Sequence, residues 1–332
     1  ARRLAGSPVE ASPLLEANAD LDAASRSRLV AAIEASVQPA LVEWLTMLED
    51  YAQHTRPGDG ICHLPDGAEL YRYHIRTWTN LDEDPESIHE YGLARLDEIE
   101  AAEASIAAEL GHDSVPALRA FLDGDPANHA SDPAAMVALV EEWVQRAEAE
   151  APKWFGDPPE QRCEVRAVEA HAEQDAPAGY YYPPTDDGSR PGIYFLNTYD
   201  PASRPLHQVV PMTFHEAVPG HHFQLTIERG LPNLPAFRRH GALLVCGAYV
   251  EGWALYSERL SAEMGLYRTP LERFGAWESE AHRAARLVVD TGLHAFGWTR
   301  QQSIEVLIAR AGLSRLEAEI ETDRYIAWPG QA

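Results

Sequence analysis

The chain has 332 residues, of which 45% are hydrophobic and 24% are charged, as in an ordinary soluble globular protein. Its formal net charge of -25 argues against nucleic acid or an anionic membrane as the main partner, because both need a basic surface. No apolar run approaches the roughly eighteen residues of a membrane span, and the few scattered cysteines exclude a disulfide framework. Since no signal segment is recognisable at the start, we expect a cytoplasmic protein.

The first half of the chain has the pattern of amphipathic helices. Apolar residues recur at helical spacing over about 22–54, where Pro39 is expected to kink or divide the helix. A second helix is predicted over about 84–111, with an Asp-Pro pair suited to its first turn, and another over 134–151.

The pattern changes near Arg162. The segment 163–171 alternates like a strand, and 192–200 is rich in aromatic and β-branched residues. The segment between them, rich in tyrosine and proline, is interpreted as turns. Helical spacing returns from about Pro211 to the end of the chain.

These elements predict a mainly α fold with a small antiparallel β-sheet next to the helix that carries a histidine motif. Residues 1–160 are expected to form a helical support region, and 161–332 the catalytic, metal-binding region. One continuous globule is expected because no low-complexity linker separates the two. The oligomeric state stays open.

The stretch TFHEAVPGHHFQ indicates a metal site, because His215 and Glu216 match the start of the His-Glu-x-x-His zinc motif. At the position of the second histidine, however, stands Pro219. A regular helix would place His222 on the face of His215, whereas a bulge at the Pro-Gly pair would turn His221 inward. The spacing alone leaves the second ligand open between His221 and His222.

A third ligand is available on the apolar segment 247–260, which carries Glu251 and Glu258 seven residues apart. A carboxylate in apolar surroundings is costly unless it is paired or bound to a metal. Two imidazoles and one carboxylate would leave an open position for water, and Glu216 would take a proton from that water. The alternative is a histidine-rich turn, with Glu251 in an ion pair with an arginine such as Arg259.

Several segments resemble the family named domain of unknown function 885 (DUF885): HEAVPGHHFQ, YVEGWALYSERL, RLVVDTGLHAFGW and RYIAWPGQA. The stretch HLPDGAELYRYHIRTWTNLDEDPESIHEYGL matches it in style, so the resemblance covers most of the chain from about Gly60. That family is similar to zinc metallopeptidases of the His-Glu plus distant-Glu type. The resemblance therefore implies a helical metallopeptidase-like fold and a zinc-dependent hydrolase, such as a carboxypeptidase, that acts on a peptide or a small amide.

Carried over residue by residue, the resemblance implies one Zn²⁺ per chain held by His215, His221 and Glu251, with Glu216 as the general base. The family pattern favours the first histidine after Pro-Gly, which selects His221 over His222. Relatives are longer at the N-terminus and continue past the PGQ element, so the resemblance also implies that this chain lacks parts seen in relatives. Another divalent transition metal in place of zinc stays open.

Residues toward the C-terminal end are candidates for contacts with a reacting oxygen. Asp290 and His294 lie four residues apart, so His294 could donate to an oxyanion while Asp290 orients it or a ligand histidine. Tyr325 could donate to the same oxyanion, and Arg324 could hold a substrate carboxylate. The alternatives are a surface Asp-His pair, a structural ion pair of Arg324 and a packed Tyr325.

The strand over 192–200 is expected at a sheet edge, where an extended peptide would add backbone hydrogen bonds. On this strand, Tyr194 and Asn197 would contact the substrate, although aromatic residues of such a strand are more often core. Arg283 and Arg286 are weaker candidates for the carboxylate contact.

The favoured function is thus a zinc-dependent hydrolase that cleaves peptide bonds with a metal-activated water. Two histidines and one carboxylate are also the ligand set of non-heme iron oxygenases, but that chemistry does not need Glu216. A third alternative is a catalytically inactive remnant that binds a peptide or a partner.

Overall fold

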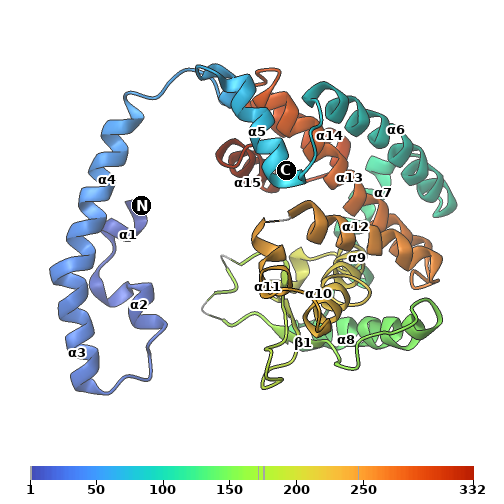
Figure 1. Cartoon of the computed structure of the whole chain (residues 1–332), viewed down its shortest axis with the longest axis horizontal. Helices are drawn as coiled ribbons and strands as arrows, with labels where there is room; N and C mark the ends of the chain where they lie inside the picture. Colours follow the sequence, from blue (N-terminus) through green and yellow to red (C-terminus); the bar gives the residue numbers. More distant parts are fainter. Residues whose placement is uncertain (1, 171, 175, 246) are drawn as a thin grey trace. The chain divides into compact units, whose positions relative to one another are not determined.

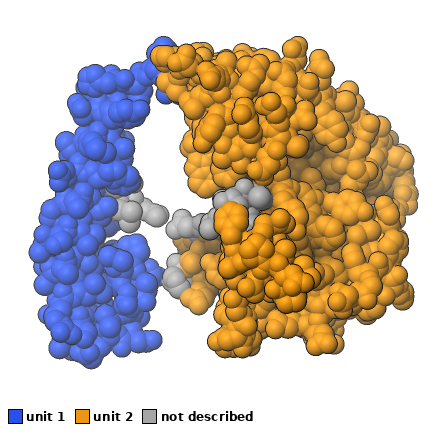
Figure 2. Space-filling view, viewed as in Figure 1, with its two compact units in different colours: residues 1–57 blue, residues 58–332 orange. Residues whose placement is uncertain are grey.

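The computed structural model describes residues 2–170, 172–174, 176–245 and 247–332. The chain divides into two compact units, unit 1 (Ala1–Pro57) and unit 2 (Gly58–Ala332), which Figures 1 and 2 show. The boundary predicted at residue 160 lies inside unit 2, whereas the two compact units divide between Pro57 and Gly58.

Unit 1 is helical, and the helix predicted over 22–54 is confirmed as two helices. Asp22 caps the first of them, since its side chain accepts hydrogen bonds from two backbone N–H groups. A π-helical turn joins the two just where Pro39, in the first turn of the second helix, has no N–H to donate. The α-helices of unit 1 are α1 (Arg2–Gly6), α2 (Pro13–Glu16), α3 (Ala23–Ala32) and α4 (Gln38–Ala52), and the π-helical turn is Ile33–Val37.

The first half of unit 2 is also helical. The predicted helices over 84–111 and 134–151 are confirmed, and aspartates cap both of them. Each has a proline in its first turn, where the missing N–H would have no partner inside the helix. The helices here are α5 (Gly67–Thr79), α6 (Pro85–Glu109), α7 (Val115–Gly124) and α8 (Pro133–Glu150).

The sheet is mixed, so the prediction of an antiparallel sheet is wrong in part. It comprises β1 (Glu164–Ala167), β2 (Gly179–Tyr182) and β3 (Ile193–Leu196), in the order β1-β3-β2. The connection 183–192 between β2 and β3 reverses the chain, so this pair is antiparallel. The connection 168–178 from β1 to β2 carries the chain past the place of β3, so β1 pairs with β3 in parallel.

This order also corrects two details of the prediction. β3 lies between two partners and is therefore no free edge for a substrate strand. β2 lies within the segment interpreted as turns, because its four residues are too short to stand out from the prolines and glycines around them.

The helical pattern predicted from about Pro211 to the end is confirmed, although the first helix begins earlier, at Leu206. None of the described helices is both long and apolar enough to cross a membrane. The helices are α9 (Leu206–Glu216), α10 (His221–Gly230), α11 (Ala236–Val245), α12 (Gly247–Glu263), α13 (Pro270–His294), α14 (Arg300–Ala311) and α15 (Arg315–Ala327).

Within unit 2, α13 is the helix around which the others are arranged. It packs against α6, α9 and α14, as Figure 1 shows. One apolar core lies among α6, α13, α14 and α15, and a second lies among α8, the sheet, α9 and α10. Since α9 contacts α13 on one side and α8 and β2 on the other, it is held between the two cores.

A glycine allows the close contact between α13 and α9. Pro211 lies inside α9 and has no N–H, so the carbonyl of His207, four residues before it, receives no hydrogen bond from that position. Gly275 of α13 lies directly against this carbonyl, since a Cβ built on Gly275 would stand 1.7 Å from the His207 oxygen. A side chain at residue 275 would therefore force the two helices apart.

We predict that Gly275→Ala lowers the free energy of unfolding by roughly 1–3 kcal/mol, because the added methyl group overpacks the contact. The measurement is the midpoint of thermal unfolding, followed by circular dichroism. Gly230→Ala is the matched control, since a Cβ there meets nothing within 4 Å. Equal midpoints for the two variants would contradict the interpretation.

Candidate metal centre

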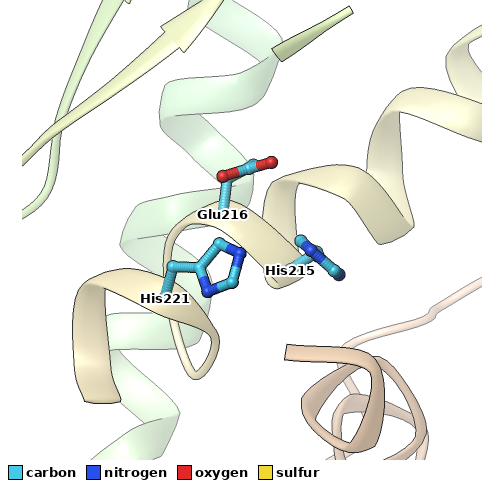
Figure 3. Close-up of side chains that lie close together, drawn as sticks. All are labelled: His215, Glu216 and His221. Atoms are coloured by element: carbon cyan, nitrogen blue, oxygen red, sulfur yellow. The ribbon is translucent and has the colours of Figure 1, made fainter. Parts of the chain in front are cut away.

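The site is formed where α9 stops and α10 begins. α9 ends at Glu216 and α10 starts at His221, and the residues between them leave the helical conformation. Gly220 makes this reversal possible, because a Cβ on it would stand 1.8 Å from the carbonyl oxygen of His215. The rings of His215 and His221 consequently lie side by side in a T-shaped arrangement (Figure 3), with centroids 4.7 Å apart and an angle of 82° between the ring planes.

These two histidines and Glu216 form a compact group of buried ligand atoms. One nitrogen of His215, one nitrogen of His221 and one carboxylate oxygen of Glu216 all lie within 4.8 Å of one another. Figure 3 shows Glu216 at the end of α9, beside both rings. The break between α9 and α10, and not the spacing of a regular helix, thus brings the two histidines together.

Glu251 reaches this group from α12. Its Oε2 lies 3.4 Å from Nε2 of His215, and its Oε1 lies 3.6 Å from Nε2 of His221. The Glu251 side chain is 62% exposed, whereas the two imidazoles are almost fully buried. The expected ligand residues therefore meet, with the carboxylate on the open side.

His222, the alternative second ligand, is turned away from the group. Its Nδ1 accepts a hydrogen bond from the hydroxyl of Tyr181 at 2.9 Å, and its Nε2 donates to the carbonyl of Gln161 at 2.9 Å. Both ring nitrogens are thus engaged between the sheet and α10. Of the two histidines that the spacing left open, His221 is the one that lies in the group with His215 and Glu216.

Glu258 orients His215, a role that the sequence analysis did not assign. Nδ1 of His215 lies 2.8 Å from Oε1 of Glu258, which is 2% exposed. A carboxylate only accepts, so Nδ1 of His215 carries a hydrogen and donates it to Glu258, which fixes the orientation of the ring. The sequence could have indicated this role of Glu258, because residues 251 and 258 are seven apart and therefore share a helix face.

The electrostatics of the group differ from residue to residue. Burial alone would lower the pKa of His215, but its contacts with Glu251 and Glu258 raise it to about 9. Burial and the neighbouring charge of His215 lower the pKa of His221 to about 4. Burial raises the pKa of Glu216 to about 7, although the charge of His215 opposes this. A carboxylate that exchanges its proton near neutrality suits a general base.

Arg283 is the arginine that faces this group. Its Nη2 lies 4.0 Å from Oε1 of Glu258, its Nη1 donates to the hydroxyl of Ser279 at 3.3 Å, and its side chain is 32% exposed. From the sequence alone, Arg283 is a weaker candidate than Arg324 for the contact with a substrate carboxylate. Its position on α13 makes it a better candidate for a substrate contact than Arg324.

His294 and Asp290 hold the backbone of distant segments together. Nδ1 of His294 accepts from the N–H of Ile61 at 3.2 Å, and its Nε2 donates to the carbonyl of Tyr325 at 3.0 Å. Asp290 accepts from the Tyr71 hydroxyl at 2.6 Å and from the N–H of Gly330 at 3.0 Å. This arrangement engages both nitrogens of the ring and leaves no N–H for an oxyanion, so the expected role gives way to a structural one.

Tyr325 and Arg324 are engaged in a similar way. The Tyr325 side chain is fully buried, and its hydroxyl donates to Oε2 of Glu321 at 2.5 Å. Arg324 pairs with Glu321 and also donates to the side chain of Gln331. Arg286 donates to Gln331 and lies over the ring of Tyr325. These contacts correspond to the alternatives given above, a structural ion pair of Arg324 and a packed Tyr325.

The two residues expected to contact the substrate, Tyr194 on β3 and Asn197 directly after it, are both buried. Asn197 is fully buried, and its side-chain amide donates to the carbonyls of Glu173 and Ala176 at 2.7 and 3.0 Å. Its Oδ1 accepts from the N–H of Tyr199, which fixes the turn after the strand. Tyr194 has no exposed surface and belongs to the apolar core beneath the sheet.

The whole chain belongs to the DUF885 family, described as bacterial proteins of unknown function, because the family model matches residues 1–332. No match is found among curated proteins. The crystal structure of a candidate lipoprotein from Colwellia psychrerythraea is similar, with a TM-score of 0.92 and 29% identity over 99% of this chain and 59% of that one.

A candidate lipoprotein of unknown function from Shewanella oneidensis has a similar fold, with a TM-score of 0.72 and 19% identity. The match covers 96% of this chain and 60% of that one. This chain thus spans about 60% of the length of each solved relative.

The Asp290 carboxyl gives a testable pH dependence of stability. Burial raises its pKa from 3.8 to about 6, although hydrogen bonds from Tyr71 and Gly330 oppose the shift. Between these values the folded chain holds a proton that the unfolded chain has released, so stability is lost as the pH rises. At about 1.4 kcal/mol per unit, the loss is about 3 kcal/mol.

Asp290→Asn removes this titration while keeping a polar side chain of the same shape. The free energy of unfolding is measured by urea denaturation for both proteins. Between about pH 3.5 and 7, the value for the variant should rise relative to that of the wild type by about 3 kcal/mol. A difference between wild type and variant that stays constant over this range would contradict the assignment.

Proposed function

We propose that this chain binds one Zn²⁺ through His215, His221 and Glu251 and hydrolyses peptide or small amide bonds. One observation carries the proposal: Glu251 places its two oxygens 3.4 and 3.6 Å from the two histidine nitrogens. Ligand atoms about 2 Å from one tetrahedral zinc ion stand roughly 3.3 Å from each other. The two observed separations are close to this value, with one carboxylate oxygen of Glu251 beside each histidine nitrogen.

The donor set fits the metal in further respects. Imidazole nitrogens and a carboxylate oxygen are ordinary ligands of zinc, and three protein ligands leave a fourth position for water. The hydrogen bond from His215 to Glu258 fixes the tautomer that a ligand needs, as in many zinc sites. Glu251 lies on the exposed side, so a substrate has access to the group.

Each side chain then has a chemical role. A bound zinc ion would act as a Lewis acid and lower the pKa of a water at the site. Glu216, whose pKa burial raises, would take the proton from that water and pass it to the leaving nitrogen. Arg283 would hold a carboxylate or an oxyanion of the substrate.

Metal content is the first test of the proposal. The purified chain should hold about one zinc by mass spectrometry, and His215→Ala should lose it, because a third of the protein ligands is removed. Glu258→Ala should keep the ligands but bind zinc roughly 10–100-fold more weakly, since His215 loses its orienting partner.

Glu263→Ala is the control for this series, since residue 263 is an exposed glutamate of the same helix. Its zinc content should equal that of the wild type. A chain that takes up no zinc even after incubation would exclude the proposal, and iron at the site would favour the oxygenase.

The hydrolytic step is tested by Glu216→Gln. This variant should turn over a mixed peptide library roughly 10²–10⁴-fold more slowly and still bind zinc, because it loses the base and keeps the ligands. Product formation is followed by mass spectrometry. Equal turnover by the variant and the wild type would eliminate Glu216 as the base, and zinc binding without any turnover would favour the inactive peptide-binding remnant.

A further inference from the structure

A groove between α12 and α13 lies behind Glu258. It has a volume of about 320 Å³, at the lower end of the roughly 300–1,000 Å³ of small-molecule pockets. Its apolar walls come from Leu255 and Ala262 of α12 and from Ala276 and Trp277 of α13. A groove of this size admits a small molecule beside these side chains.

Two residues that line the groove each have a buried polar atom without a hydrogen-bond partner. These atoms are Oε2 of Glu258 and the hydroxyl of Tyr267, in side chains that are 2% and 7% exposed. A buried carboxylate oxygen and a buried hydroxyl without partners are costly, so both favour a ligand that supplies them.

The charges of the groove define the chemistry of such a ligand. The buried Glu258 carboxylate calls for an N–H donor, best supplied by an ammonium group. Arg273 also lines the groove, but it is paired with Glu109 at 3.1 Å. Arg259 lines the groove with a side chain that is 58% exposed and lies 3.9 Å from Glu280, so it favours a ligand carboxylate toward the solvent. Glu280, which also lines it, is already paired with Arg95 at 2.7 Å.

We propose that this groove binds a free α-amino acid with an aliphatic side chain. The ammonium group donates to Glu258, the Tyr267 hydroxyl bonds to the ligand's polar end, and Arg259 receives its carboxylate. The aliphatic side chain lies against Ala276 and Trp277. This binding depends only on the groove and does not require hydrolysis.

The shared carboxylate links the groove to the metal centre, and this link rests on the proposed function. Oε1 of Glu258 accepts the hydrogen bond from His215, and Oε2 is the buried oxygen without a hydrogen-bond partner. Zinc at His215 and an ammonium group in the groove are both cations that compete for the charge of one carboxylate. Each therefore weakens the binding of the other, and by linkage the effect is equal in both directions.

Calorimetric titration of the metal-depleted full chain with L-leucine is the direct test. We expect saturable binding of one molecule per chain, with 4-methylpentanoate, which lacks the ammonium group, and 3-methylbutylamine, which lacks the carboxylate, about tenfold weaker or more. Tyr267→Phe should weaken L-leucine about fivefold, the effect of one hydrogen bond. Tyr256→Phe, on an exposed side chain of α12, should change nothing.

Two further measurements separate this site from the metal centre. Arg259→Ala should weaken L-leucine about fivefold and leave 3-methylbutylamine unaffected, because only the amino acid has a carboxylate. Zinc should weaken L-leucine, whereas L-leucine bound directly to the zinc ion would bind more tightly when zinc is present. No saturable binding, equal affinity in Tyr267→Phe, or tighter binding with zinc would each overturn the inference. Because the titration uses metal-free protein, a failed zinc or turnover test leaves it intact.

Discussion

The interruption of the helical chain after Glu216 is the constraint on which the candidate site depends. A regular helix would carry His221 away from the face of His215, because residues six apart do not share a face. Gly220 lets the chain fold back against the carbonyl of His215, and this brings the two rings together. The site is therefore built by a backbone conformation that one residue without a side chain permits.

The surrounding helices support this interruption from both sides. α12 supplies Glu251 to the open side and Glu258 to the buried side of His215, one carboxylate on each nitrogen of the ring. α13 contacts α9 through Gly275 and carries Arg283 toward the same group. The geometry of a few side chains thus depends on packing between helices that are far apart in the sequence.

The sequence predicts what depends on local pattern and composition. Helical periodicity predicted α6 and α8, and an Asp-Pro pair indicated the start of α6. The family motifs indicated His215, His221 and Glu251, which the structure brings close together. The parallel pairing of β1 with β3 could not be predicted, because strand order depends on contacts across the whole unit. The roles of His294 and Asn197 were hidden for the same reason, since their partners are backbone groups of remote segments such as Ile61.

The division of the candidate ligands between α10 and α12 has a consequence for the resistance of the chain to proteolysis. His221 opens α10, Glu251 lies on α12, and α11 connects the two. A cation held by His221 and Glu251 would close this segment into a loop and oppose its local opening. The peptide bonds of α11 should then be cut more slowly by an added protease when the metal is present, which makes limited digestion a reporter of occupancy.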